Sequence, residues 1–298
     1  MKEIRKATVI GGGLMGSGIA QVICEAGIDV CINDIKDEFV EKSINGIFNR
    51  WESKVKKGKI TEETCLEYKA KLSGNTDLKE AASGSDIVIE AASENFNIKK
   101  SIFNTLGEVC PEDTIFCSNT SSIEISKLAA ETGRPEKFIG THFFSPVPVM
   151  KLLEVIPGIL TDDETLEQIM DFGKTIGKTC IISKDTTGFI VNKLLDPMLN
   201  EAAMLVENGI GSVEDIDTGM KLGLNHPMGP LELMDMVGID VHYAVMQVIY
   251  AQTGNPGYAP APLLRRMYEA GLYGKKVGKG FYIYNEDGTK YPNPAVTK

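Results

Sequence analysis

Short apolar segments alternate with amphipathic segments over roughly the first 185 residues. Residues 7–10 are apolar and lead into a glycine turn, and the next stretch has the pattern of a helix that ends near Gly27. A second apolar segment, residues 30–32, stops at Asp34. Strands that alternate with helical stretches are typical of βαβ units and a parallel sheet. We therefore predict an α/β fold in which this part is a doubly wound, Rossmann-type sheet.

The alternation continues in three further apolar segments. They are predicted to be buried strands and read "SDIVIE", "TIFCS" and "KFIGTHFF". Polar loops follow the first two, with Glu94 and Asn95 in one loop and residues 118–122 in the other. Because ligands bind outside the carboxyl ends of strands in open α/β sheets, we expect the second loop and His142 to converge there. Ser122 is interpreted as the N-cap of the helix that follows it.

Two parts of the chain depart from this alternation. Residues 37–74 have the pattern of two helices joined near "KKGKIT", which predicts a helical hairpin inserted into the first domain. Beyond Asp185 the strand-like segments disappear, and helical segments alternate with glycine and proline breaks. We place the boundary between this residue and Gly188. The predicted domains are residues 1–186, which hold the sheet, and residues 187–298, an all-α C-terminal domain.

The composition is that of a globular chain with a large apolar core. The 298 residues are 43% hydrophobic, and the N-terminus runs from charged residues straight into a short strand, unlike a signal peptide. We therefore expect a soluble, cytoplasmic protein without a membrane segment. The six cysteines include no C-x-x-C pair, so neither a metal site nor a disulfide framework is predicted. The formal charge of -10 argues against a nucleic-acid partner.

The glycine turn has the G-x-G-x-x-G spacing of a dinucleotide-binding loop, with Gly11, Gly13 and Gly16 at the glycine positions. In that loop the first glycine permits a tight turn, the second lets the backbone approach a pyrophosphate, and the third lets helix pack against strand. The helix N-terminus then directs N–H groups at the phosphates. Asp34 is placed to accept hydrogen bonds from an adenosine ribose and to repel a 2′-phosphate. These residues predict NAD as the cofactor.

Positive charge is concentrated in the helical insertion. Residues 41–60 contain six basic and two acidic side chains, an excess of four positive charges in a chain that is negative overall. The basic residues are Lys42, Arg50, Lys54, Lys56, Lys57 and Lys59. Such a run is often only a solvated helix face. Its contrast with the rest of the chain also permits a site for a phosphate-bearing substrate, and both interpretations stay open at this point.

Three histidines are the candidates for proton transfer. His142 stands among aromatic and apolar residues, twelve positions before Glu154. A histidine in such a neighbourhood is more often part of a core, although histidine is also the commonest acid–base catalyst. His226 lies in a predicted turn and His242 in a predicted helix, and both are interpreted as structural. The local pattern alone leaves the role of His142 open.

Six ordered segments carry a resemblance to a known family. They are "VIGGGLMGSGIA", "SNTSSI", "THFFSPVPVMKLLEVI", "DTTGFIVNKLL", "EDIDTGMKLGLNHPMGPLELMD" and "GKKVGKGFYIY". The sequence resembles the L-3-hydroxyacyl-CoA dehydrogenase family over essentially its full length. The resemblance implies an NAD-dependent dehydrogenase that interconverts short-chain L-3-hydroxyacyl-CoA and 3-oxoacyl-CoA thioesters, such as 3-hydroxybutyryl-CoA and acetoacetyl-CoA. It also implies that the C-terminal domain closes the cleft and forms much of a homodimer interface.

The resemblance further implies catalytic and cofactor-binding residues. His142 corresponds to the catalytic histidine and Glu154 to the acidic residue that orients it, while Ser121 and Asn192 correspond to polar residues at the reacting end of the substrate. Contacts with NAD are implied for Gly11, Gly13, Leu14, Met15, Gly16, Asp34, Glu94, Lys99, Asn119, Ser121, Ser145 and Lys276. The family usually has asparagine at the position of Ser145, and the shorter serine side chain has less reach toward the cofactor.

Coenzyme A contacts are implied for Ser43 and Arg50 in the basic insertion, although a lysine is the familiar residue at the second position. Two alternatives to the implied activity remain. One is a related NAD-dependent dehydrogenase of a free hydroxy acid or sugar acid, for which the basic insertion would have no purpose. The other is a non-catalytic NAD-binding protein, which would not need the set of His142, Glu154 and Asn192.

Overall fold

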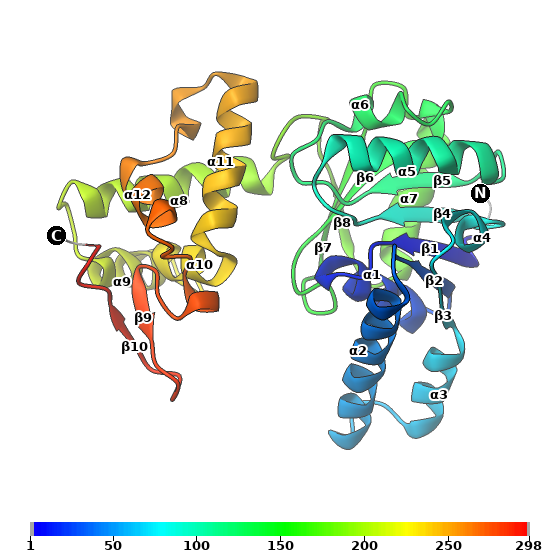
Figure 1. Cartoon of the computed structure of the whole chain (residues 1–298), viewed down its shortest axis with the longest axis horizontal. Helices are drawn as coiled ribbons and strands as arrows, with labels where there is room; N and C mark the ends of the chain where they lie inside the picture. The colour runs from blue at the N-terminus through cyan, green and yellow to red at the C-terminus, as the bar shows by residue number, and fades with distance from the viewer. Residues whose placement is uncertain (1–2, 297–298) are drawn as a thin grey trace. The chain divides into compact units, whose positions relative to one another are not determined.

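The computed structural model describes residues 3–296. The chain divides into two compact units, of which the first ends at Phe189 and the second begins at Ile190 (Figure 1). Within residues 3–296, no helix has both the length and the apolar character needed to cross a membrane. The same residues contain no group of three or more His, Cys, Asp or Glu side chains that could hold a metal ion.

The first unit is built on an eight-stranded sheet in the order β3-β2-β1-β4-β5-β6-β7-β8. The first six strands in this order run parallel, whereas β7 is antiparallel to β6 and parallel to β8. The strands are β1 Lys6–Ile10, β2 Asp29–Asn33, β3 Leu72–Asn75, β4 Ile87–Glu90, β5 Ile115–Ser118, β6 Phe138–Phe143, β7 Leu152–Pro157 and β8 Thr179–Ile182. The chain changes direction across the sheet between β1 and β4, so the predicted doubly wound fold is confirmed, and its crevice lies at the carboxyl ends of these strands.

Helices cover both faces of the sheet. They are α1 Leu14–Glu25, α2 Asp37–Lys56, α3 Glu62–Ala70, α4 Leu78–Ala82, α5 Phe96–Val109, α6 Ile125–Ala129 and α7 Asp163–Thr175. Apolar side chains of α1 and α7 pack on one face, and those of α5 and α6 pack on the other. The side chains of Thr61, Asp77 and Asn95 cap α3, α4 and α5 by accepting hydrogen bonds from free backbone N–H groups.

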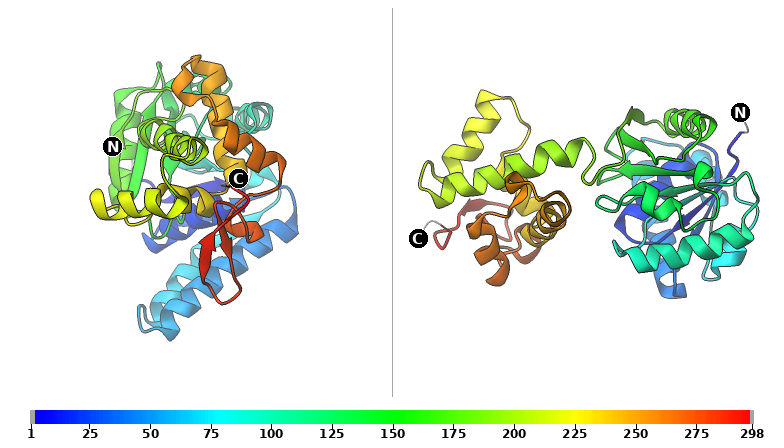
Figure 2. Two further views of the ribbon diagram at one scale, coloured as in Figure 1. Left: turned by 90° about the vertical axis from the view of Figure 1, so that its left-hand side faces the viewer. Right: turned by 90° about the horizontal axis from the view of Figure 1, so that it is seen from above.

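The predicted helical insertion is formed by α2 and α3, which extend from the sheet as a hairpin (Figures 1 and 2). An aromatic contact joins the two helices, since the ring of Trp51 in α2 lies 5.5 Å from that of Tyr68 in α3, tilted by 48°. One part of the expected segment differs, because Leu72–Asn75 forms the edge strand β3 beside β2. These four residues have no strong strand pattern, and only the pairing with β2 makes them a strand.

The second unit is predominantly helical, as predicted. Its helices are α8 Val191–Glu207, α9 Val213–Gly223, α10 Pro230–Val237, α11 Ile239–Thr253 and α12 Pro262–Glu269. The sequence pattern predicts no strand here, yet Tyr282–Tyr284 (β9) pairs with Lys290–Pro292 (β10) in a small antiparallel sheet. The buried carboxylate of Asp235 accepts hydrogen bonds from the backbone N–H groups of Phe281 and Tyr282, both at 2.9 Å. This tertiary contact fixes three-residue strands that are too short to be recognised from the sequence.

Candidate active site

The glycine turn between β1 and α1 has the geometry that a dinucleotide requires. Gly11 has φ = 98°, and a Cβ added there would lie 2.6 Å from the carbonyl oxygen of Ala91. A Cβ added to Gly16 would overlap the carbonyl oxygen of Gly11. Gly13 differs, because an added Cβ would meet nothing within 4 Å. The turn is therefore closed toward the protein and open at Gly13, where α1 begins with free N–H groups.

Asp34 lies directly beside this turn. Its Oδ2 accepts a hydrogen bond of 2.7 Å from the N–H of Gly12, and its Oδ1 accepts one of 2.7 Å from the N–H of Ile35. The carboxylate lines a pocket of about 940 Å³ together with the glycine turn and α2. Both oxygens keep further lone pairs for the hydroxyls of a ribose. Leu14 is also in this pocket with 75% of its surface exposed, whereas Met15 packs against the apolar core.

The basic insertion contributes Ser43 and Arg50 to the same pocket. Ser43 is buried, and its hydroxyl has no hydrogen-bond partner among the described residues. The guanidinium of Arg50 faces α1, where Nε donates to Oε1 of Gln21 at 2.5 Å. Partial burial lowers the pKa of this guanidinium, and the nearby Glu25 carboxylate opposes that change. Lys54 is bound to Glu25 at 2.6 Å, so part of the insertion's positive charge is neutralised within the unit.

His142 and Glu154 form a buried pair at the carboxyl end of β6. The two residues are direct partners in the antiparallel register of β6 and β7, which brings their side chains to the same face of the sheet. His142 Nδ1 lies 2.7 Å from Glu154 Oε2, and its Nε2 lies 3.1 Å from the hydroxyl oxygen of Ser121. Both partners are buried, with Glu154 fully inaccessible. An ionised Glu154 accepts a hydrogen bond from Nδ1–H, which leaves Nε2 of the neutral ring as the acceptor.

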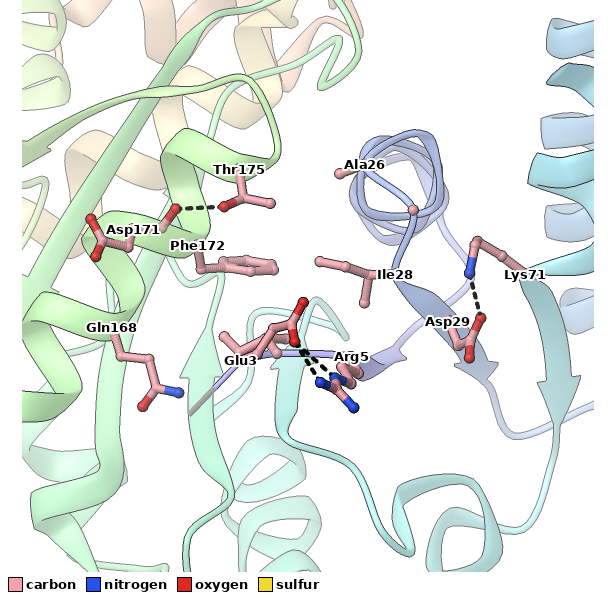
Figure 3. A pocket seen from close by; sticks show the side chains of 12 residues that line it. Glu3, Arg5, Ala26, Ile28, Asp29, Lys71, Gln168, Asp171, Phe172 and Thr175 are labelled. Atoms are coloured by element: carbon pink, nitrogen blue, oxygen red, sulfur yellow. Dashed lines mark hydrogen bonds and ion pairs between the residues drawn. The ribbon is translucent and has the colours of Figure 1, made fainter. Parts of the chain in front are cut away.

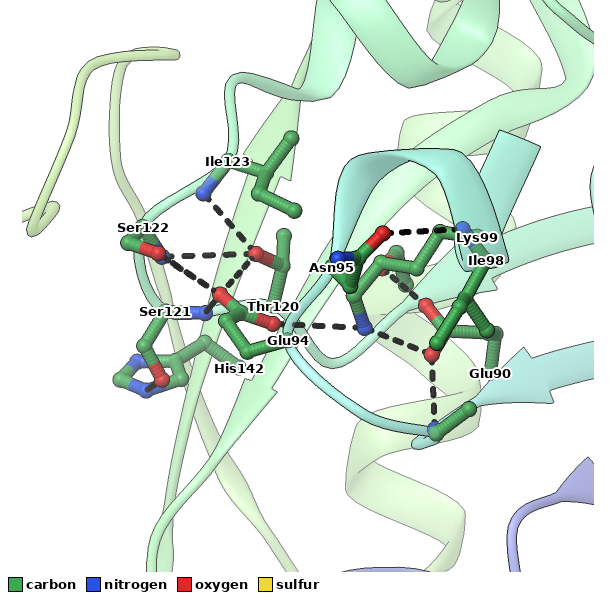
Figure 4. A network of polar contacts seen from close by, with 12 residues as sticks. Glu90, Glu94, Asn95, Ile98, Lys99, Thr120, Ser121, Ser122, Ile123 and His142 are labelled. Atoms are coloured by element: carbon green, nitrogen blue, oxygen red, sulfur yellow. Dashed lines mark hydrogen bonds and ion pairs between the residues drawn. The ribbon is translucent and has the colours of Figure 1, made fainter.

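Glu94 organises the loop that carries Ser121 (Figure 4). Its Oε1 accepts hydrogen bonds from the Thr120 hydroxyl, the Ser121 and Ser122 N–H groups and the Ser122 hydroxyl. Burial alone would raise the pKa of Glu94, but the Lys99 ammonium and these donors outweigh it and hold the pKa below its usual value. The predicted role of Ser122 as an N-cap is wrong, because the N-cap of α6 is Glu124 and Ser122 is engaged with Glu94.

Lys99 lies next to the Glu94 carboxylate and is fully buried. Its ammonium group is 2.6 Å from Glu90 Oε1 and 3.3 Å from Glu94 Oε2. Glu90 in turn accepts hydrogen bonds from the Ser118 hydroxyl at 2.6 Å and the Ala92 N–H at 2.7 Å. The sequence reasoning missed Glu90, whose only signal is an acidic residue at the end of an otherwise apolar strand. The chain of contacts links β4, β5 and α5 to the loop beside His142.

The remaining predicted residues of the first unit lie around the ends of β5 and β6. Asn119 Oδ1 accepts a hydrogen bond of 2.9 Å from the N–H of Phe143, which ties the two strand ends together. Ser145 is exposed in the loop that follows β6. Two aromatic rings that the sequence reasoning did not select flank the imidazole of His142. The ring centroids of Phe144 and Phe189 lie 4.7 and 5.5 Å from that of the histidine.

Two predicted residues belong to the second unit. Asn192 is the second residue of α8, and Lys276 lies in the short η3 helix Lys275–Val277, where its ammonium group is 2.7 Å from an oxygen of Asp240. Of the other histidines, His242 is buried with Nδ1 3.4 Å from a carboxylate oxygen of Asp196. Its Nε2 has no hydrogen-bond partner among the described residues.

A second cavity of about 510 Å³ lies at the opposite edge of the sheet, at the amino ends of β1 and β2 (Figure 3). Its charged side chains are paired, with Arg5 bound to Glu3 at 2.7 Å and Lys71 bound to Asp29 at 3.1 Å. It holds no histidine and no buried nucleophile. The residues that line this cavity therefore include no candidate for acid–base catalysis by histidine.

Comparison with known proteins gives the same family for both units. The family described as "3-hydroxyacyl-CoA dehydrogenase, NAD binding domain" matches residues 6–186, and its "C-terminal domain" matches residues 188–284. A protein of Bacillus subtilis named "Probable 3-hydroxybutyryl-CoA dehydrogenase" is 44% identical over 95% of this chain and 99% of its own. The human "Hydroxyacyl-coenzyme A dehydrogenase, mitochondrial" is 42% identical over 94% of this chain and 91% of its own. The crystal structure of (S)-3-hydroxybutyryl-CoA dehydrogenase from Ralstonia eutropha superimposes with a TM-score of 0.92, at 44% identity over 95% of this chain and 100% of that one.

Proposed function

The chain belongs to the 3-hydroxyacyl-CoA dehydrogenase family, and from this premise we propose that it interconverts 3-hydroxybutyryl-CoA and acetoacetyl-CoA with His142 and Glu154 as the acid–base pair. It is an NAD-dependent oxidoreductase, as the sequence predicted. The observation that carries the proposal is the buried His142–Glu154 pair, in which Nε2 of the histidine faces the Ser121 hydroxyl at the carboxyl edge of the sheet. Both the pair and the glycine turn lie where ligands bind in this class of fold.

The glycine turn and Asp34 fit NAD. Gly13 leaves open space at the start of α1, and the Asp34 carboxylate stands beside it with lone pairs free for a ribose diol. NAD bound there would supply the hydride acceptor for C3 of the hydroxyacyl group, and NADH would supply the hydride donor in the reverse direction. A 2′-phosphate would meet the charge of Asp34, so the site favours NADH over NADPH.

Proton transfer is assigned to His142. In oxidation the C3 hydroxyl proton passes to Nε2 as the C3 hydride leaves, so a C=O double bond forms and the ring becomes an imidazolium. Glu154 accepts a hydrogen bond from Nδ1–H throughout and stabilises that cation. In reduction the imidazolium gives the Nε2 proton to the oxygen at C3 as the hydride arrives. Ser121, whose hydroxyl touches Nε2, positions the same oxygen, and Asn192 is proposed as its second polar contact.

Glu94 and Lys99 hold the loop that carries Ser121 in position. The Glu94 carboxylate holds the N–H groups of Ser121 and Ser122, and Lys99 compensates its charge. Because Lys99 is fully buried, we assign its effect on the cofactor to the position that it gives Glu94. Lys276, Asn119 and Ser145 remain proposed cofactor contacts.

Coenzyme A is the proposed ligand of the basic insertion. The buried Ser43 hydroxyl lacks a partner in the described part of the chain, and the Arg50 guanidinium lines the same pocket. An unpaired buried hydroxyl is costly, so a ligand atom that accepts its hydrogen bond would offset that cost. A homodimer through the second unit is also proposed, since several large apolar side chains of this unit are exposed, including Leu222 at 82% and Leu224 at 63%.

The test compares acetoacetyl-CoA with free acetoacetate under NADH oxidation, for the wild type and for His142→Gln. We expect turnover with the thioester, little with the free acid, and a large loss in the variant. The matched control is His242→Gln, because His242 is also buried beside a carboxylate but lies in the helical unit. Faster turnover of the free acid would favour the hydroxy-acid alternative. Wild-type turnover in folded His142→Gln would remove the proposed mechanism.

A further inference from the structure

Phe189 has a backbone conformation that is rare for its residue type. Its φ is 45°, and among the described residues only one other residue apart from glycine, Asn225, has a positive φ. In the left-handed region Cβ crowds the backbone, so a bulky residue remains there only when its surroundings over-determine it. Gly188, directly before it, has φ = 80° and is the residue type that adopts this region freely. Something other than local preference therefore keeps Phe189 in place.

The side chain of Phe189 supplies the reason. It is 2% exposed and packs into the apolar cluster on the α5 face of the sheet. Its ring centroid lies 5.5 Å from that of His142, with an angle of 58° between the planes. The ring of Phe144 lies 4.7 Å from the same imidazole, tilted by 59°. Glu154 and Ser121 thus hold the two nitrogens of the histidine, while the two phenyl rings restrict the tilt of its plane.

The segment before Phe189 is anchored to the first unit. Both carboxylate oxygens of Asp185 accept hydrogen bonds of 2.7 Å, from the N–H groups of Ile125 and Ser126. The N–H of Phe189 donates to the carbonyl oxygen of Thr186 at 3.0 Å. These contacts fix the turn at both ends, and the left-handed residues within it let the ring enter the core while the backbone continues into α8.

We propose that Phe189 is a positioning residue for His142, held in a left-handed conformation at the end of the first unit so that its ring fixes the plane of the imidazole. The inference rests on the proposed role of His142. Without the phenyl ring the His142 imidazole would be free to tilt. Its hydrogen bond to Glu154 would then be weaker, and Nε2 would be at the wrong angle to the substrate oxygen. Phe189 touches neither reactant in this scheme, so its effect falls on turnover and not on binding.

The test uses Phe189→Leu and Phe189→Gly, with Phe103→Leu as the matched control. Phe103 is fully buried in the same apolar cluster, but its ring contacts Phe116 and Phe138. We expect kcat of Phe189→Leu to fall roughly 10- to 100-fold, because a displaced catalytic group costs this much. The KM for acetoacetyl-CoA and the Kd for NADH should change less than about twofold. Phe103→Leu should lose thermal stability and keep kcat.

The glycine variant separates the ring from the backbone. Phe189→Gly relieves the left-handed conformation and removes the ring, so its kcat should fall at least as far as that of Phe189→Leu. Wild-type turnover in the glycine variant would overturn the proposal. If Phe189→Leu does not fold, Phe189→Met replaces it, because methionine fills a similar volume without a flat ring.

The pH profile of kcat gives a readout that a purely structural role would not move. A weaker hydrogen bond to Glu154 in Phe189→Leu disfavours the imidazolium, so the profile for oxidation should shift to lower pH. The profile of Phe103→Leu should match that of the wild type. An unshifted profile and unchanged kcat in folded Phe189→Leu would refute this inference alone, provided that His142→Gln is inactive. An active His142→Gln would refute the proposed function as well.

Discussion

Glu154→Gln tests the proposed mechanism with the smallest change in shape. The substitution keeps the volume of a fully buried side chain and removes one negative charge 2.7 Å from Nδ1 of His142. An adjacent opposite charge favours the ionised form of its partner by about 1.4 to 4 kcal/mol, the equivalent of one to three units on the pH scale. The transition state for oxidation contains a forming imidazolium, so the barrier should rise by the same range. The expected loss in kcat is roughly 10- to 1000-fold.

The assay follows NADH formation from 3-hydroxybutyryl-CoA and NADH consumption with acetoacetyl-CoA. At a fixed pH the substitution cannot change the overall equilibrium constant of the reaction. The specificity constants of the two directions, each taken over both of its substrates, must therefore fall by the same factor. NADH titration should give a Kd close to that of the wild type, because the proposed cofactor contacts do not include Glu154. The matched control is Asp196→Asn, which removes the carboxylate beside the other buried histidine, His242, and should leave kcat unchanged. Folded Glu154→Gln with kcat within about twofold of the wild type would contradict the assigned role of this charge.

Three further predictions follow from other parts of the structure. Asp34→Ala should weaken NADH binding and narrow the difference in kcat/KM between NADH and NADPH, and a wild-type preference for NADPH would show that Asp34 does not select the cofactor. Arg50→Glu should raise the KM for acetoacetyl-CoA more than the KM for a truncated thioester that lacks the nucleotide, and equal effects would argue against a coenzyme A site on the insertion. Burial raises the pKa of Asp235 from 3.8 to about 6 in the folded state, although the hydrogen bonds from Tyr282 and Phe281 act to lower it. The stabilising contribution of this group is therefore complete below the unfolded pKa and is lost as the pH rises through about 6. Asp235→Asn should therefore flatten the dependence of the melting temperature between about pH 4 and pH 6, the range over which this group accounts for up to about 3 kcal/mol, and an unchanged slope would show that the carboxyl does not titrate there.

The amino-acid sequence by itself determined the elements whose rules are local. The strand Lys6–Ile10, the glycine turn and the helix after it follow from a buried apolar run, from glycines that the turn geometry requires, and from a helix start with free N–H groups. Asp34 directly follows the next strand, Asp29–Asn33. The parallel pairing of this strand with Lys6–Ile10 places Asp34 beside the glycine turn. The predominantly helical second unit was also predictable, because helical periodicity interrupted by glycine and proline needs no long-range contact to be recognised.

The tertiary structure decided what depends on contacts between distant segments. His142 and Glu154 are twelve residues apart, and only the antiparallel register of β6 and β7 makes them direct partners. The sequence predicted Ser122 as a helix N-cap, whereas in the folded chain its hydroxyl donates to Glu94, twenty-eight residues earlier in the chain. The family resemblance implies that Lys99 contacts NAD, and the fold buries its side chain beside Glu90 and Glu94. The physical reason is the same in each case: a polar side chain takes whichever partner the packed strands bring within hydrogen-bond distance, and that partner is not encoded by its neighbours in sequence.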